Sequence, residues 1–72
     1  MILKKIESDI VVSAVEVKSF VVSIDSNNNK ATITVTLDNV DNTEAVFSQE
    51  PGDSHIYQIV DNSDNLIRLI HQ

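Results

Sequence analysis

The sequence has no cysteine and no tryptophan, and only one glycine, one proline and three other aromatic residues. Without cysteine, the chain can form neither disulfides nor thiolate zinc sites. A chain of 72 residues buries a modest fraction of its surface, and small domains usually add a disulfide, a metal or a partner subunit. We therefore expect one domain, residues 1–72, stabilised by a partner subunit, by a carboxylate or histidine metal site, or by an unusually efficient core.

Basic residues are also scarce. Five lysines and arginines stand against eleven aspartates and glutamates, so the formal net charge is −6. Nucleic-acid-binding proteins normally show a basic stripe, whereas these five cations are scattered, and we expect no nucleic-acid partner. An acidic surface can meet a basic protein or mimic nucleic acid, although it ordinarily only keeps a protein soluble.

Long hydrophobic runs are absent as well. The most apolar region, Ile10–Ile24, is interrupted by Glu16 and Lys18 and falls short of the roughly 20 apolar residues of a membrane helix. Met1–Ser8 is not followed by the apolar run of a signal peptide. We expect no membrane partner and a cytoplasmic location, or a place in a virion if the protein is a phage component.

Valine and isoleucine are plentiful, and turn-forming Asn, Asp and Ser fall in clusters between the apolar runs. β-Branched residues suit a pleated sheet better than a helix. This pattern predicts an all-β fold: a small antiparallel sandwich or open barrel of five to six short strands joined mainly by hairpins.

The clearest strand is Ala31–Asp38, in which apolar residues alternate with threonine. Its predicted partner is Lys18–Asp25, with Asp25 opposite Lys30, because this register sets apolar side chains against each other and a one-residue slip would exchange the faces. The predicted core pairs are Ile24–Ala31, Val22–Ile33 and Phe20–Val35.

The connection between these two strands reads DSNNNK. It has the alternate oxygen spacing that opens a calcium loop, but Lys30 and Thr36 stand where an EF-hand requires glycine and a bidentate glutamate. We interpret it as a turn with Asn27 and Asn28 at its tip, since asparagine tolerates the positive φ of a type I′ turn. Glu50–Asp53 reads as a type II turn.

A second hairpin is predicted between His55–Val60 and Leu66–His71, with Val60 opposite Leu66. This register makes both faces apolar, and it places His55 opposite His71. A hairpin that is apolar on both faces lies between two layers or between two subunits. Imidazole is the commonest metal ligand in proteins, so the facing histidines are a candidate metal site.

Before Lys18 the apolar residues occupy both faces of the chain, and Glu16 indicates a bulge or corner with separate strands on either side. The surplus of apolar surface predicts a homo-oligomer, a dimer or a trimer. The expected interface residues are Val15, Val17, Val21, Tyr57, Ile59, Ile67 and Leu69. The acidic residues that could form a patch for a basic partner are Asp38, Asp41, Glu44, Asp61 and Asp64.

Three functional classes follow, and catalysis is not among them, because no nucleophile with a neighbouring base can be identified. The first is a non-enzymatic structural, assembly or interaction module, such as a small virion, tail or scaffold component, which binds itself and another protein. The second is an acidic inhibitor or nucleic-acid mimic. The third is a metal-binding module built on His55 and His71. We expect no cofactor.

Overall fold

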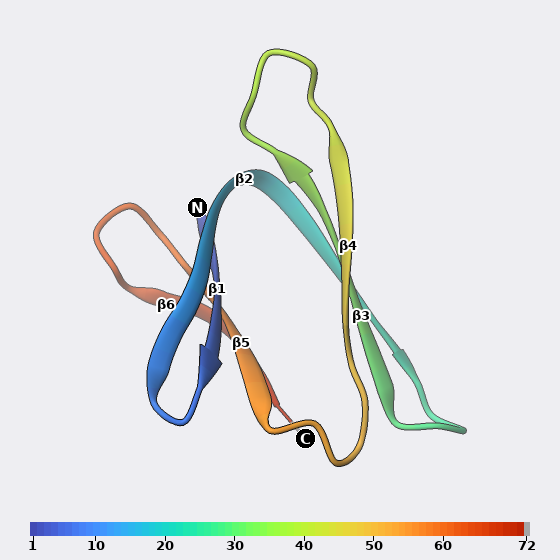
Figure 1. Ribbon diagram of the computed structural model, residues 1–72. Helices are drawn as coiled ribbons and strands as arrows, with labels where there is room; N and C mark the ends of the chain where they lie inside the picture. The colour runs from blue at the N-terminus through green and yellow to red at the C-terminus, as the bar shows by residue number, and fades with distance from the viewer. Residues whose placement is uncertain (72) are drawn as a thin grey trace.

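The computed structural model describes residues 1–71, which form strands, turns and loops without a helix. The strands are β1 (Ile2–Glu7), β2 (Ile10–Asp25), β3 (Lys30–Leu37), β4 (Glu44–Gln49), β5 (His55–Val60) and β6 (Leu66–Ile70). They form one antiparallel sheet in the order β4-β3-β2-β1-β5-β6, curled into a half-barrel (Figure 1). The predicted all-β fold is confirmed, with the open barrel as its form; residue 72 of the predicted domain lies outside the described part.

Strand β2 connects the two halves of the sheet. Its first half pairs with β1 and its second half pairs with β3, so one strand belongs to both halves of the sheet. In Figure 1 it arches over the other strands, with β1, β5 and β6 under one limb and β3 and β4 by the other. Nothing within residues 1–71 forms a helix that could cross a membrane.

The bend in β2 coincides with a bulge at Lys18, where the register with β3 shifts between Val17 and Ser19. A bulge adds one residue to one strand and so exchanges its faces. Val17 before the bulge and Phe20 after it therefore both point into the concave side, and Val17 is only 1% exposed. The corner predicted near Glu16 is thus present, two residues further along. The prediction of separate strands on either side of it is wrong, because the chain continues through the bulge as one strand, Ile10–Asp25.

The predicted register between β2 and β3 is confirmed from Asp25–Lys30 to Ser19–Thr36. The turn differs from the prediction. Asn29 has a φ of 52°, whereas Asn27 and Asn28 are not among the residues with positive φ, so the connection is a four-residue loop rather than a type I′ turn. Asp25 closes it by accepting hydrogen bonds from the Asn27 backbone N–H at 2.9 Å and the Asn28 amide at 3.2 Å.

The predicted register between β5 and β6 is wrong beyond its first pair. Val60 pairs with Leu66 as expected, but the ladder then shifts, so that Ile59 pairs with Arg68 and Tyr57 with Ile70. Ile67 is the extra residue of this bulge. Val12 is the extra residue of a further one, where the β1–β2 register shifts between Lys5 and Ile6. Because both faces of the β5–β6 hairpin are apolar, a one-residue slip keeps apolar contacts on each side, and the pattern specifies the register weakly.

Two other turns have clear local causes. Ser8 and Asp9 connect the paired residues Glu7 and Ile10 with φ angles of 51° and 64°, which is the two-residue type I′ geometry. The predicted type II turn is confirmed: Gly52 has a φ of 91°, and the Asp53 N–H donates to the Glu50 carbonyl at 3.1 Å.

The core lies on the concave side of the half-barrel. Its largest fully buried side chains are Leu3, Ile33, Ile59, Gln49, Val17 and Val35. They come from all strands except β6, which adds Ile70 at 6% exposure. Phe47 of β4 and Tyr57 of β5 join the two halves through a ring contact with centroids 5.8 Å apart.

Candidate functional site

The structure divides the predicted interface residues between the inside and the outside. Val17, Tyr57 and Ile59 are buried core residues at 1%, 4% and 0% exposure, and Val15 is half-buried and packs against them. Their assignment to an interface is therefore corrected. The bulge at Lys18 places Val15 and Val17 on the same side as Phe20, and Ile59 lies on the concave side because it opposes the buried Leu3 of β1. The predicted interface residues that stay exposed are Val21, Ile67 and Leu69.

A different set of apolar residues covers the convex side of β1, β5, β6 and the first half of β2. Residues that oppose each other in the ladders share a face, and Ile6 opposes both Val11 and Ile56. A second row runs from Ile2 through Val60 to Leu66, and Leu69 opposes Gln58 between the two rows. We call this surface the outer apolar face; its members are Ile2, Ile6, Val11, Ile56, Leu66 and Leu69.

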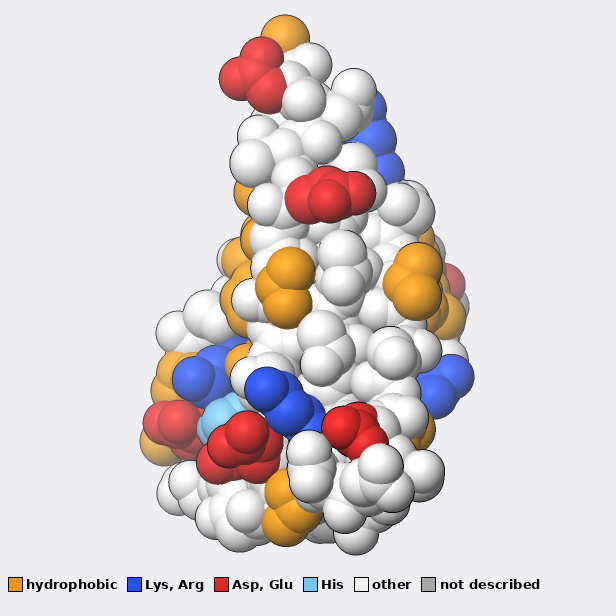
Figure 2. All heavy atoms as spheres, turned by 90° about the vertical axis from the view of Figure 1, so that its right-hand side faces the viewer, with side chains coloured by type: hydrophobic (Ala, Val, Ile, Leu, Met, Phe, Trp, Pro, Cys, Tyr) orange, Lys and Arg blue, Asp and Glu red, His pale blue; other side chains and the backbone are white. Residues whose placement is uncertain are grey.

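The convex side of the other half is different. There Val21, Thr34 and Val46 lie in one row, and the two valines are 66% and 65% exposed. Figure 2 shows this side of the molecule, with hydrophobic side chains set apart by polar ones. Singly exposed hydrophobic residues are normal on protein surfaces, so this half presents no continuous apolar surface.

The five predicted acidic residues fall into two groups. Asp38, Asp41 and Glu44 lie in or beside the β3–β4 loop, and Asp61 and Asp64 lie in the β5–β6 loop; these loops are well separated in Figure 1. Asp64 forms an ion pair with Lys4 at 2.8 Å. The structure therefore does not gather the five residues into one acidic patch.

Asp61 has a structural role in its own loop. Its carboxylate accepts hydrogen bonds from the backbone N–H groups of Asn65 and Ser63, each at 2.9 Å. Foremost the Asn65 backbone hydrogen bond, and then the one from Ser63, lower the pKa of this carboxyl, because they favour its charged form. The side chain thus closes the β5–β6 turn rather than presenting its charge to a partner.

The predicted pairing of His55 with His71 is wrong, because the shifted ladder sets Tyr57 opposite Ile70 instead of Leu69. His55 contacts the Tyr57 ring edge-on with centroids 5.2 Å apart, whereas His71 lines a pocket beside β2. Among residues 1–71, no group of three His, Cys, Asp or Glu side chains could hold a metal ion.

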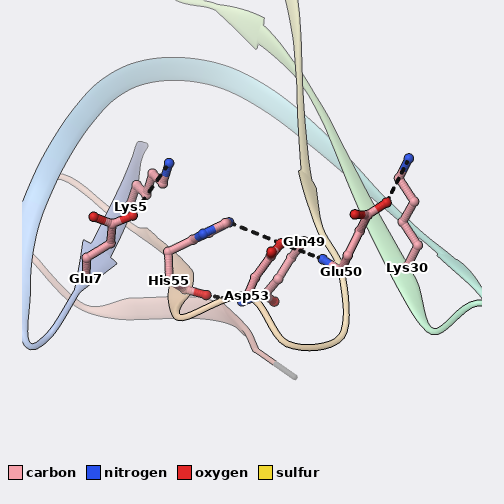
Figure 3. A network of polar contacts seen from close by, with 7 residues as sticks. All are labelled: Lys5, Glu7, Lys30, Gln49, Glu50, Asp53 and His55. Carbon is pink, nitrogen blue, oxygen red and sulfur yellow. Dashed lines mark hydrogen bonds and ion pairs between the residues drawn. The ribbon is translucent and has the colours of Figure 1, made fainter.

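A network of polar contacts extends across the open end of the half-barrel. His55 Nε2 lies 3.8 Å from Asp53 Oδ2, and Asp53 accepts the Glu50 N–H at 2.8 Å. Glu50 in turn lies 3.7 Å from Lys30. Figure 3 shows these residues strung between the two limbs of β2, so the network ties β5 to β3 through the β4–β5 loop.

Two polar groups inside this network have no hydrogen-bond partner in the described part of the chain: Gln49 Oε1 and His55 Nε2. Next to them, burial raises the pKa of the Tyr57 hydroxyl, and the negative charges of Asp53 and Glu7 raise it further. All of these effects disfavour the phenolate form. Ionisation of the Tyr57 hydroxyl at this end of the molecule is therefore unfavourable.

A pocket of about 200 Å³ lies between β6 and the hairpin of β2 and β3. Its aliphatic residues are Val22, Ile24, Ala31, Leu69 and Ile70, and Asn29, Arg68 and His71 supply polar groups. Ile24 opposes the buried Ala31 and so lies on the concave face, yet it is 62% exposed. The half-barrel is thus unfilled at this point.

The sequence interpretation missed Ile2, Ile6, Val11, Ile56 and Leu66 of the outer apolar face, and it missed the setting of Arg68. In the second hairpin the interface was assigned to the face of Tyr57 and Ile59, whereas the structure leaves the face of Ile56 and Leu66 on the convex side. No signal in the sequence marks Ile67 as a bulge. The structure is needed to see that Lys4, Lys5 and Lys30 each have a carboxylate partner, whereas Arg68 has none within residues 1–71.

Comparison of the chain with models of protein families, with curated proteins and with solved structures finds no match in any of the three.

Proposed function

We propose that the protein is a non-enzymatic structural or assembly module that works as a homo-oligomer, in which copies associate through the outer apolar face. The observation that carries the proposal is a pair of apolar rows across neighbouring strands, Val11–Ile6–Ile56 over β2, β1 and β5 and Ile2–Val60–Leu66 over β1, β5 and β6. Lys4 and Gln58 lie between the two rows, and Val60 is only 3% exposed. Val11, Leu66 and Leu69 are 50%, 57% and 40% exposed in the isolated chain.

Burial explains why association is favourable. In the described residues, large hydrophobic side chains that are exposed are at least as numerous as the buried ones. Each Å² of apolar surface removed from water stabilises an assembly by about 25 cal/mol. A second copy presents the same face, and two like faces related by a two-fold axis bury each other at one closed interface.

Light scattering coupled to size-exclusion chromatography tests the proposal. We expect the wild-type protein to have a multiple of the 8.0 kDa chain mass at micromolar concentration. The double variant Val11→Lys/Leu66→Lys places two charges on the outer apolar face and should elute as a single chain. Val40→Lys is the matched control, because Val40 is 97% exposed in the β3–β4 loop, and it should keep the wild-type mass. A monomeric wild type, or dissociation by Val40→Lys alone, would contradict the proposal.

A further inference from the structure

The half-barrel has an open seam between β6 and the second half of β2. Strand β6 pairs only with β5, and residues 19–25 of β2 pair only with β3, within the part of the chain that the structure describes. Each strand therefore has one edge whose backbone groups are not used in a ladder. An extended peptide adds to such an edge through main-chain hydrogen bonds.

The seam contains the pocket described above. Its wall is made by side chains that point toward the core, because Val22 opposes Ile33 and Ile24 opposes Ala31. A volume of about 200 Å³ exceeds that of a dry cavity of ~150 Å³ that accepts benzene. The space therefore suits one aliphatic side chain together with a small polar group.

Arg68 gives the pocket its charge. It opposes Ile59 in the ladder and so lies on the concave side of β6. Lys4, Lys5 and Lys30 each have a carboxylate within 4.0 Å, and Lys18 donates to the Asn42 side chain. Arg68 has no such partner among residues 1–71.

Arg68 is thus a cation without an acidic partner in the described part of a chain of net charge −6, and a bound anion would neutralise its charge. The planar guanidinium matches a carboxylate with two parallel hydrogen bonds. A carboxylate directly beside an aliphatic side chain is the chemistry of the last residue of a peptide that ends in valine or isoleucine. His71 stands next to the same position.

We propose that the seam binds the C-terminus of an extended peptide. The terminal carboxylate pairs with Arg68, and the last side chain, an aliphatic one, covers Val22 and Ile24. The peptide residues before the last one lie along the seam and form main-chain hydrogen bonds with the unused edge of β6 or of β2. Arg68 and Ile70 oppose core residues, whereas Leu69 belongs to the outer apolar face and also lines the pocket at its rim. The pairing of the carboxylate with Arg68 does not depend on the proposed self-association.

Fluorescence anisotropy with a labelled hexapeptide of serine and threonine that ends in valine tests the site. The peptide with a free carboxylate should bind, and the same peptide with a C-terminal amide should bind roughly tenfold to hundredfold more weakly, as expected for the loss of a charge-assisted hydrogen bond. Arg68→Gln should weaken binding of the free-carboxylate peptide by a similar factor. Lys18→Gln, which removes a cation from the bulge in β2, is the matched control and should leave the affinity unchanged.

A second variant tests the aliphatic wall. Ile24→Ser alters a side chain that is already 62% exposed, so the fold should persist by circular dichroism, and binding should weaken by about tenfold. Equal affinity of the acid and amide peptides, or no loss on Arg68→Gln, would overturn the proposal. Competition by isovalerate at concentrations equal to those of the peptide would overturn it too, since the site would then select small carboxylates. The oligomer mass of Arg68→Gln should match that of the wild type, which separates this result from the self-association test.

Discussion

The side-chain amide of Gln49 donates a hydrogen bond to the backbone carbonyl of His55. Gln49 is fully buried at 0% exposure and lies on β4, whereas His55 begins β5, and these strands belong to opposite halves of the sheet. The bond therefore joins the two halves at the end where the half-barrel is open. It complements the Phe47–Tyr57 ring contact on the same side.

The hydrogen bond from Gln49 to His55 predicts that substitutions of Gln49 lower the stability of the fold by different amounts. Gln49→Leu removes the donor but also removes the unpartnered Oε1, and we expect a loss of about 1 kcal/mol. Gln49→Glu places a carboxylate at a fully buried position facing a carbonyl oxygen, and the loss should reach about 3 kcal/mol or more. Urea unfolding measures both losses.

Gln58→Glu is the control for this comparison. Gln58 is only half-buried and opposes Lys4, so this substitution should be neutral. Equal losses for Gln49→Leu and Gln49→Glu would contradict the role given to Gln49.

Tyr57 predicts an alkaline limit of stability. Burial, and then the charges of Asp53 and Glu7, raise its pKa above the usual value of 10.0. Since the folded pKa lies above the unfolded one, this group's contribution to stability is complete below about pH 10 and is lost as pH rises through the folded pKa. Thermal unfolding should show a steeper alkaline decline for the wild type than for Tyr57→Phe.

Tyr57 is the only tyrosine of the chain, so its ionisation can be followed directly by ultraviolet absorbance. The folded protein should titrate at higher pH than the same protein in urea. Coincident titration curves in the two states, or parallel alkaline declines of the wild type and Tyr57→Phe, would show that the hydroxyl is not desolvated.

The β1–β2 turn predicts a gain in stability. Ser8 and Asp9 both have positive φ, a conformation that asparagine and glycine adopt at lower cost. Ser8→Asn/Asp9→Gly should therefore stabilise the protein by about 1 kcal/mol, seen as a higher melting temperature. Asp41→Gly removes the same charge at a loop position that is not among those with positive φ. A similar gain from Asp41→Gly would assign the effect to charge instead of turn geometry.

The sequence predicted the β2–β3 hairpin residue by residue because apolar and polar side chains alternate there without interruption, and such alternation fixes the parity of the pairing. Near Glu16 a charged pair broke the pattern and revealed a corner, although not that Lys18 would bring Val15 and Val17 onto the same face as Phe20. At Ile67 nothing broke the pattern, since both faces of that hairpin are apolar. The metal prediction depended on that register and changed with it.

Only part of the outer apolar face follows from the sequence once the bulge at Ile67 is known. Leu69 then shares a face with Ile56 and Leu66, while Ile70 shares the other face with Tyr57 and Ile59. Which of the two faces is buried follows from the packing of β1 and not from the bulge. The pocket at Arg68 could not be predicted, because it depends on the space left between β6 and β2 in the curled sheet. No local sequence pattern determines that space.

The bulge at Lys18 also constrains how this sequence can diverge. Lys18 itself is exposed, so other residue types fit at its position. Deleting it would instead return residues 13–25 to a single parity, and every side chain between Ser19 and Asp25 would change sides relative to Val15 and Val17. We therefore expect this stretch to tolerate changes of residue type more readily than changes of length, and insertions and deletions to be tolerated in the loops at either end of β2.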